Sequence, residues 1–322
     1  MEIIREDAFH DAMTLEVLPY LAKWRTEGYF TASDGKELYY ETYHTDALPV
    51  RGIAVLIHGF SESVDKFYEN VYYFMKLGYD VFLPELRGHG KSFRYVDDRS
   101  KVHVPDYRLF VSDLDDLMTK KVIPTNTDGL PYILFAHSMG GAISGLYLEE
   151  HPGVFAKAVF SSPMMALNGK PIPVWVQNAV ESIFCLAGKG TDYAAGMKPY
   201  DGSETFETGF SNSPSRWAYH HERIAQDPLS QTCGATWRMG REMVRMTKAV
   251  RRESACARVR TPVLLFSAGN DTLVSGEGQK EFIRKIPRGR IQTLDGCKHE
   301  LYMADEKSLS EYWNAIEAFL AE

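Results

Sequence analysis

The stretch Tyr132–Gly145, YILFAHSMGGAISG, decides how this chain folds. A short apolar run ends at His137-Ser138, and a segment rich in glycine and alanine follows it. This order predicts a buried strand, a sharp turn at Ser138 and then a helix. The uncharged run Pro131–Leu148 is long enough to suggest a membrane span, but its polar centre and its change of period argue against one.

Other short apolar runs resemble this strand and are separated by helical patterns: GIAVLIHGF, YDVFLPEL, AKAVFSSP, TPVLLFSAG and RIQTLDG. Continuous apolar runs indicate strands that are buried on both faces, as in parallel sheets covered by helices. Near the start, residues 7–27 have a helical pattern, and Asp34-Gly35 joins two alternating runs, which predicts an antiparallel hairpin. We therefore predict an α/β fold with a mostly parallel central sheet and helices on both faces.

The rhythm of strands stops for nearly a hundred residues in the middle of the chain. Residues 166–258 are rich in Trp, Met, Gly and Pro, have helical patterns and contain no convincing strand. We expect this segment to be an inserted helical cap. Residues 1–165 would then form the first part of the core domain, and residues 259–322 the second part.

Composition narrows the functional classes. The chain has 322 residues and a formal net charge of −7, which disfavours nucleic acid as the main partner. Its four cysteines are far apart and suggest neither disulfides nor a zinc site. Together with an acidic N-terminal segment that does not resemble a secretory signal, they favour a cytoplasmic location. No residue spacing implies a metal, and no cofactor is expected.

Ser138 has the setting of an activated nucleophile. Small residues two positions before and after it, Ala136 and Gly140, match the G-x-S-x-G turn between a strand and a helix, with alanine in the first position. The alternative is a glycine-rich turn without chemistry. A serine nucleophile needs a histidine base and a carboxylate that orients it.

Two residues late in the chain suit these roles, in the order Ser, Asp, His. Asp271 follows the strand VLLFSAG, and His299 follows the next strand and precedes a final amphipathic helix. Asp271 would otherwise be a turn or capping residue. Asp295 is the rival acid, although it lies only four residues before His299 and is better placed to bend that loop.

The amides of Phe60 and Met139 are the expected oxyanion donors, because IHGF (Ile57–Phe60) ends an early strand and matches the H-G loop that accompanies such a serine turn, and Met139 follows Ser138. The alternative is that this H-G pair forms only a short turn of a common kind. We count their neighbours His58, Gly59 and His137 as candidate substrate-binding residues. In the cap, apolar side chains such as Trp175, Phe184 and Trp217 exceed what a small helical insert buries internally. Some of them are expected to line an acyl-chain tunnel, and the alternative is that they form only the core of the cap.

The segments LIHGF, ELRGHGKS, AHSMGGA, HPGVFAKAVFSSPM and KHEL resemble the α/β-hydrolase superfamily. More narrowly, they are similar to the bacterial lysophospholipase and monoacylglycerol lipase group, also described as serine aminopeptidase S33-like. The resemblance spans most of the chain and implies a serine hydrolase that cleaves esters of single-chain lipids. One departure lies outside the triad, where Glu85 replaces the usual Asp.

Two alternatives to lipid ester hydrolysis stay open: a carboxylesterase or peptidase for small soluble substrates, and a non-catalytic ligand-binding protein with a hydrolase fold. A basic stretch, Trp237–Arg260, carries eight Lys or Arg residues against two Glu. It suggests a cap helix that makes peripheral contact with a membrane surface, and the alternative is a solvated helix face. The sequence leaves the oligomeric state undetermined.

Overall fold

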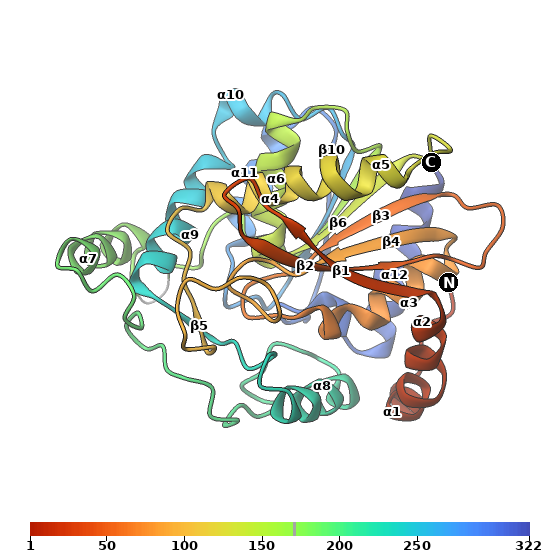
Figure 1. Ribbon diagram of the computed structural model, residues 1–322, viewed down its shortest axis with the longest axis horizontal. Coiled ribbons are helices and arrows are strands. Elements are labelled where there is room, and N and C mark those ends of the chain that lie inside the picture. Colours follow the sequence, from red (N-terminus) through yellow and green to blue (C-terminus); the bar gives the residue numbers. More distant parts are fainter. Residues whose placement is uncertain (170–171) are drawn as a thin grey trace.

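A computed structural model describes residues 1–169 and 172–322. Its main feature is an eight-stranded sheet with the strand order β1-β2-β4-β3-β6-β7-β9-β10 (Figure 1). The strands are β1 (Arg25–Thr31), β2 (Glu37–Tyr43), β3 (Gly52–Ile57), β4 (Tyr79–Pro84), β6 (Tyr132–His137), β7 (Lys157–Ser161), β9 (Val263–Ala268) and β10 (Gly289–Leu294).

Six strands, from β4 to β10 across the sheet, run parallel, and each corresponds to one of the predicted apolar runs. The predicted hairpin is also confirmed, because β1 and β2 pair antiparallel and β2 continues antiparallel onto β4. The helix predicted over residues 7–27 is wrong at its end. It stops at Trp24, because Arg25, Thr26 and Glu27 pair with β2 and so continue the sheet.

Helices cover both faces of the sheet, as predicted (Figure 1). On one face lie α4 (Arg108–Leu117), α6 (Ser138–Glu150) and α11 (Gly276–Lys285); on the other lie α2 (Leu18–Trp24), α3 (Tyr68–Lys76) and α12 (Glu306–Ala321). The side chains of β3 show why both faces are apolar. Val55 and Ile57 pack toward α4 and α6, whereas Ala54 and Leu56 pack toward α3 and α12.

The segment between β7 and β9 contributes none of its described residues to the large sheet. It contains α7 (Val174–Leu186), α8 (Pro214–Gln226), α9 (Trp237–Ala249) and α10 (Glu253–Cys256). The prediction that it holds no strand is wrong in one detail, because β8 (Gly234–Ala235) pairs with β5 (Lys101–Val102). Two residues are too few to produce a periodic signal. The remaining short helices are α1 (Phe9–Ala12) and α5 (Ile123–Thr125).

A buried ion pair attaches α8 to the rest of the molecule. The Arg216 side chain is fully buried, and its Nη2 lies 2.7 Å from Oε1 of Glu69 on α3 and 2.8 Å from the carbonyl oxygen of Ile4. Loss of Arg216 would leave the Glu69 carboxylate in the interior without its cation. This contact therefore fixes the position of α8 relative to the sheet.

Of the helices in the described part of the chain, none combines the length and the apolar character needed to cross a bilayer. The uncharged run Pro131–Leu148 is divided between β6 and α6, in agreement with its change of period.

Candidate active site

Ser138 occupies a strained turn between β6 and α6. Its φ of 49° is in the left-handed region, which few non-glycine residues adopt. A Cβ on Gly140 would lie 2.5 Å from the carbonyl oxygens of Ile57 and His58, so this position requires glycine. The backbone thus forms the predicted sharp elbow, which places the Ser138 side chain at the carboxyl edge of the sheet.

His299 and Asp271 meet Ser138 from two loops at the same edge. The Nε2 atom of His299 lies 2.8 Å from Oγ of Ser138, and its Nδ1 atom lies 2.7 Å from Oδ2 of Asp271. Since a carboxylate only accepts hydrogen bonds, Nδ1 carries a proton and Nε2 is free to accept the hydroxyl proton of the serine. The three predicted residues are therefore assembled in the order that base-assisted nucleophilic attack requires.

The Asp271 side chain is 5% exposed and is held from both sides. While Oδ2 accepts the His299 proton, Oδ1 accepts the amide hydrogens of Leu273 at 2.9 Å and Val274 at 3.0 Å. Burial alone would raise the pKa of Asp271, but His299 and the two amides outweigh burial and lower it. The rival Asp295 is exposed and does not contact His299 among the described residues.

The two expected oxyanion donors lie beside Ser138. Met139 is the second residue of α6, where a backbone N–H has no carbonyl partner within the helix. Phe60 belongs to the turn that follows β3, and no acceptor for its N–H occurs among residues 1–169 and 172–322. A Cβ on Gly59 would lie only 3.0 Å from Cβ of Ser138, so this turn is close to the nucleophile.

A cluster of buried polar side chains, which no sequence pattern marks, lies beside the triad. Glu62 accepts hydrogen bonds from the amide of Gly59 and the hydroxyl of Tyr302, and Lys66 contacts Glu300. The predicted site residue His137 belongs to this region. Its ring centroid lies 4.8 Å from that of His299, and burial lowers the pKa of His137 to about 3, so its ring is neutral.

A cavity opens next to the triad, between the loop that carries His299 and helix α8. Its lining combines aromatic and apolar side chains with an ion pair: Tyr200, Phe210, Trp217, Met303, Lys66 and Glu300. Of the three predicted cap residues, Trp217 therefore lies at a cavity beside the catalytic groups. The Phe210 ring centroid is 6.5 Å from that of His299, so one wall of the cavity lies close to the base.

The other predicted substrate-binding residues are placed differently. Trp175 is 71% exposed on α7, and Phe184 stacks on Trp237 at 4.2 Å, within the packing between α7 and α9. Neither lines the cavity. His58 is fully buried; its Nδ1 atom donates to the Gly59 carbonyl and its Nε2 atom accepts from the Leu86 amide. Its ring nitrogens thus hold the turn and leave no polar contact for a substrate.

The fold and the Ser-His-Asp arrangement are those of an α/β-hydrolase. The chain belongs to the serine aminopeptidase S33 family, whose model matches residues 49–306. Probable lysophospholipase L2 of Haemophilus influenzae is 26% identical over 321 residues, which cover 99% of each chain. Lysophospholipase L2 of Escherichia coli K12 is 27% identical over 98% of this chain and 93% of its own length. A soluble variant of monoglyceride lipase from Saccharomyces cerevisiae, solved in complex with a substrate analog, shares the fold with a TM-score of 0.75 and 18% identity, over 92% of this chain and 95% of its own.

Proposed function

We propose that this protein is a serine hydrolase that cleaves the carboxylic ester of a single-chain lipid, a lysophospholipid or a monoacylglycerol. The observation that carries the proposal is the continuous chain of hydrogen bonds from Ser138 through His299 to Asp271. A buried structural serine has no need of a histidine whose other nitrogen is fixed by a carboxylate. This arrangement activates the hydroxyl as a nucleophile.

The reaction follows from the proton positions. Oγ of Ser138 attacks the acyl carbonyl carbon while Nε2 of His299 takes its proton, and the amides of Phe60 and Met139 stabilise the resulting oxyanion. The tetrahedral intermediate collapses, the ester C–O bond breaks, and His299 gives its proton to the departing alcohol. Water then attacks the acyl-serine with the same base, which releases the fatty acid and restores Ser138. The steps need no cofactor.

Two features support a lipid substrate. The full-length relatives named lysophospholipase L2 cover nearly all of this chain, so they share the cap segment as well as the core. The cavity beside the triad also has apolar and aromatic walls, including Phe210, Trp217 and Met303. Each methylene moved from water into such a site contributes about 0.8 kcal/mol, so a long acyl chain would bind far more tightly than a short one.

The proposal is tested by labelling and by a substrate panel. A fluorophosphonate should label the wild-type protein stoichiometrically and should not label Ser138→Ala, in which turnover should fall by a factor on the order of 10⁶. The panel compares lysophosphatidylcholine, monoolein, p-nitrophenyl esters of increasing length and an aminoacyl p-nitroanilide. Absence of labelling would indicate a ligand-binding protein, and a maximum at acetyl esters or at the anilide would favour the small-substrate alternative.

We also infer peripheral contact between the cap and an anionic membrane surface. Helix α7 exposes Trp175, Ile183 and Leu186 on one side, with exposed fractions of 71%, 63% and 88%. It lies at the periphery of the molecule beside α9 (Figure 1). Two cations of α9 lie near it: Arg238, whose amide donates to the carbonyl oxygen of Gly190 after the end of α7, and Arg241, which is close to Glu181. An apolar helix face bordered by cations is typical of helices that lie in a membrane interface.

The structure changes the basis of this inference. The basic stretch Trp237–Arg260 does not form one continuous charged face, because Arg245 pairs with Glu242 and Arg251 with Glu281. The exposed apolar side chains of α7 therefore supply most of the expected affinity. A cytoplasmic location stays a prediction from the sequence.

Vesicle flotation tests the membrane contact. The wild-type protein should float with vesicles of equal parts phosphatidylglycerol and phosphatidylcholine, and less with phosphatidylcholine alone. Trp175→Glu should weaken binding about tenfold or more, because burying an aromatic side chain contributes roughly 2 kcal/mol. Leu15→Glu is the matched control, since Leu15 is 75% exposed at a site remote in sequence from the cap. Equal flotation of the three proteins would refute the contact.

A further inference from the structure

Three consecutive amides form the turn after β3, and two of them already have side-chain acceptors. The Gly59 N–H donates to Oε2 of Glu62, and the Ser61 N–H donates to Nε2 of His89 at 3.2 Å. The Phe60 N–H between them has no acceptor among the described residues. The turn thus presents one unoccupied amide beside Ser138.

His89 is a hydrogen-bond acceptor at this turn. It is fully buried, and its Nδ1 lies 3.1 Å from the carbonyl oxygen of Arg87. Since a carbonyl only accepts, Nδ1 carries the proton and Nε2 has the free lone pair that faces Ser61. Burial, with the nearby His58, keeps the pKa of His89 well below its usual value, so the ring stays neutral.

Ser61 needs such a partner. Its φ of 57° is in the left-handed region, which is unfavourable for serine and typical of residues held by their surroundings. The ring of Phe60 also packs edge-on against His89, with centroids 6.2 Å apart. His89 therefore contacts the turn through both a hydrogen bond and an aromatic contact.

Glu62 links the turn to the loop that carries the base. Its two carboxylate oxygens are divided between the Gly59 amide and the hydroxyl of Tyr302, three residues after His299. The side chain is buried, so both hydrogen bonds are shielded from water. A displacement of Glu62 would move the amide turn relative to the His299 loop.

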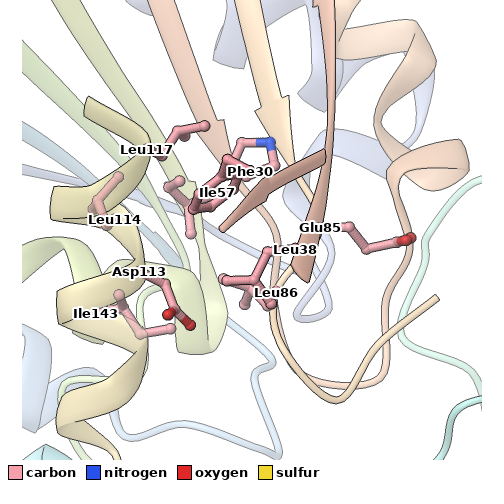
Figure 2. A pocket seen from close by; sticks show the side chains of 10 residues that line it. Phe30, Leu38, Ile57, Glu85, Leu86, Asp113, Leu114, Leu117 and Ile143 are labelled. Atoms are coloured by element: carbon pink, nitrogen blue, oxygen red, sulfur yellow. The ribbon is translucent and has the colours of Figure 1, made fainter. Parts of the chain in front are cut away.

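A second buried carboxylate attaches the loop of His89 to the same region. Figure 2 shows Glu85 beside a small cavity that is lined by apolar side chains such as Phe30, Ile57 and Leu86. The Glu85 carboxylate is turned away from these side chains. The carboxylate accepts the amides of Val64 at 3.3 Å and Lys91 at 2.6 Å. It thus joins the chain just after Glu62 to the chain just after His89.

We propose that His89 and Glu62 are positioning residues for the oxyanion turn: by accepting the amides on either side of Phe60, they leave the Phe60 N–H free to face the oxyanion. The inference rests on the proposed function, because an oxyanion forms only if Ser138 attacks an ester. Neither residue needs to touch the substrate. Both act through the geometry of the backbone.

Matched substitutions distinguish loss of the hydrogen bond to the turn from a mere change of the polar side chain at that position. In His89→Asn the side chain reaches the position of Nδ1 but not that of Nε2. It therefore keeps the hydrogen bond to the Arg87 carbonyl and loses the hydrogen bond from the Ser61 amide. In His89→Gln an oxygen reaches the position of Nε2. Likewise, Glu62→Leu removes both acceptors, whereas Glu62→Gln retains an oxygen for Gly59. The control is Glu149→Gln, which replaces a buried carboxylate at the far end of α6.

The experiment measures kcat and KM on one p-nitrophenyl ester. It also measures affinity for a trifluoromethyl ketone, which forms a tetrahedral adduct, and for the corresponding alkyl ether, which does not. His89→Asn and Glu62→Leu should lower kcat by a factor on the order of 10², as loss of an oxyanion donor does, with KM nearly unchanged. Affinity for the ketone should fall in parallel, and affinity for the ether should not change. The glutamine variants should recover most of the loss.

The outcomes distinguish the inference from the function on which it rests. Wild-type protein that hydrolyses no ester overturns the proposed function, and the inference with it. Active wild-type protein together with a folded His89→Asn variant of unchanged kcat overturns the inference alone. If Glu62→Leu does not fold, the His89 pair decides. Equal losses of ketone and ether affinity would mean that the substitutions distort the whole site, and would also overturn the inference.

Discussion

Replacement of Asp271 by asparagine is the sharpest test of the triad, because the structure determines how the new amide would orient. Oδ1 of Asp271 accepts two backbone amides, from Leu273 and Val274, whereas Oδ2 accepts the Nδ1 proton of His299. An asparagine has only one oxygen, and the two amides favour it at the Oδ1 position. Its NH₂ group would then face His299.

This orientation reverses the tautomer of the base. An NH₂ group facing Nδ1 requires Nδ1 to accept, so the ring proton moves to Nε2, which lies 2.8 Å from Oγ of Ser138. An imidazole in this form has no free lone pair for the serine proton. We expect kcat to fall by a factor on the order of 10⁴, or about 5.4 kcal/mol in the activation free energy.

The assay is steady-state hydrolysis of a p-nitrophenyl ester by Asp271→Asn, with thermal unfolding to establish that the variant is folded. Asp295→Asn is the control, because Asp295 is exposed and should change kcat no more than about twofold. If Asp271→Asn kept more than about a tenth of wild-type kcat, the tautomer argument would be wrong. A larger loss in Asp295→Asn than in Asp271→Asn would assign the acid to Asp295.

Two further predictions concern close packing and buried charge. In Gly59→Ala the new Cβ would lie 2.8 Å from Oε2 of Glu62 and 3.0 Å from Cβ of Ser138. The turn must therefore shift, and kcat should fall by a factor of up to about 10². The control Gly276→Ala, whose new Cβ would lie 3.5 Å from its nearest neighbour, should keep wild-type kcat. Equal kcat in the two variants would contradict the packing argument. Burial raises the pKa of Glu149 to about 8, so its contribution to stability is present below the ordinary carboxyl pKa and is lost as pH rises through about 8. Glu149→Gln should therefore gain stability over wild type as the pH rises from 5 to 8, by about 3 kcal/mol in the free energy of unfolding. Chemical unfolding that gives the same difference between the two proteins at both ends of this range would refute the argument.

The sequence predicted those parts of the fold that depend on a repeated local pattern. Each apolar run became a strand because its residues are buried on both faces, as Val55 and Leu56 show from opposite sides of β3. Ser138, Asp271 and His299 were identified because each follows such a strand, and the carboxyl ends of parallel strands share one edge. Asp34-Gly35 located the hairpin because a tight turn needs a residue in the left-handed region, and Gly35 adopts it with a φ of 79°.

Features that depend on single long-range contacts could not be predicted in this way. The pairing of Arg216 with Glu69 and the hydrogen bonds of Glu62 and His89 join residues from separate segments, and no periodicity marks them. The cap was also misjudged in detail. Trp175 is of the apolar type expected to line an acyl-chain tunnel. However, the packing of α7 on α9 determines which side of that helix faces outward, and Trp175 lies on the exposed side.

The strand order explains why the buried cluster matters to the site. β3 and β6 are neighbours, so the oxyanion turn and the elbow at Ser138 follow adjacent strands and lie side by side. β10 is an edge strand, separated from β6 by β7 and β9, and the His299 loop must therefore cross two strands to reach Ser138. Such a crossing loop needs a contact at its far end. The hydrogen bond from Tyr302 to Glu62 supplies it, and because Glu62 also holds Gly59, one side chain sets the position of the base relative to the oxyanion turn.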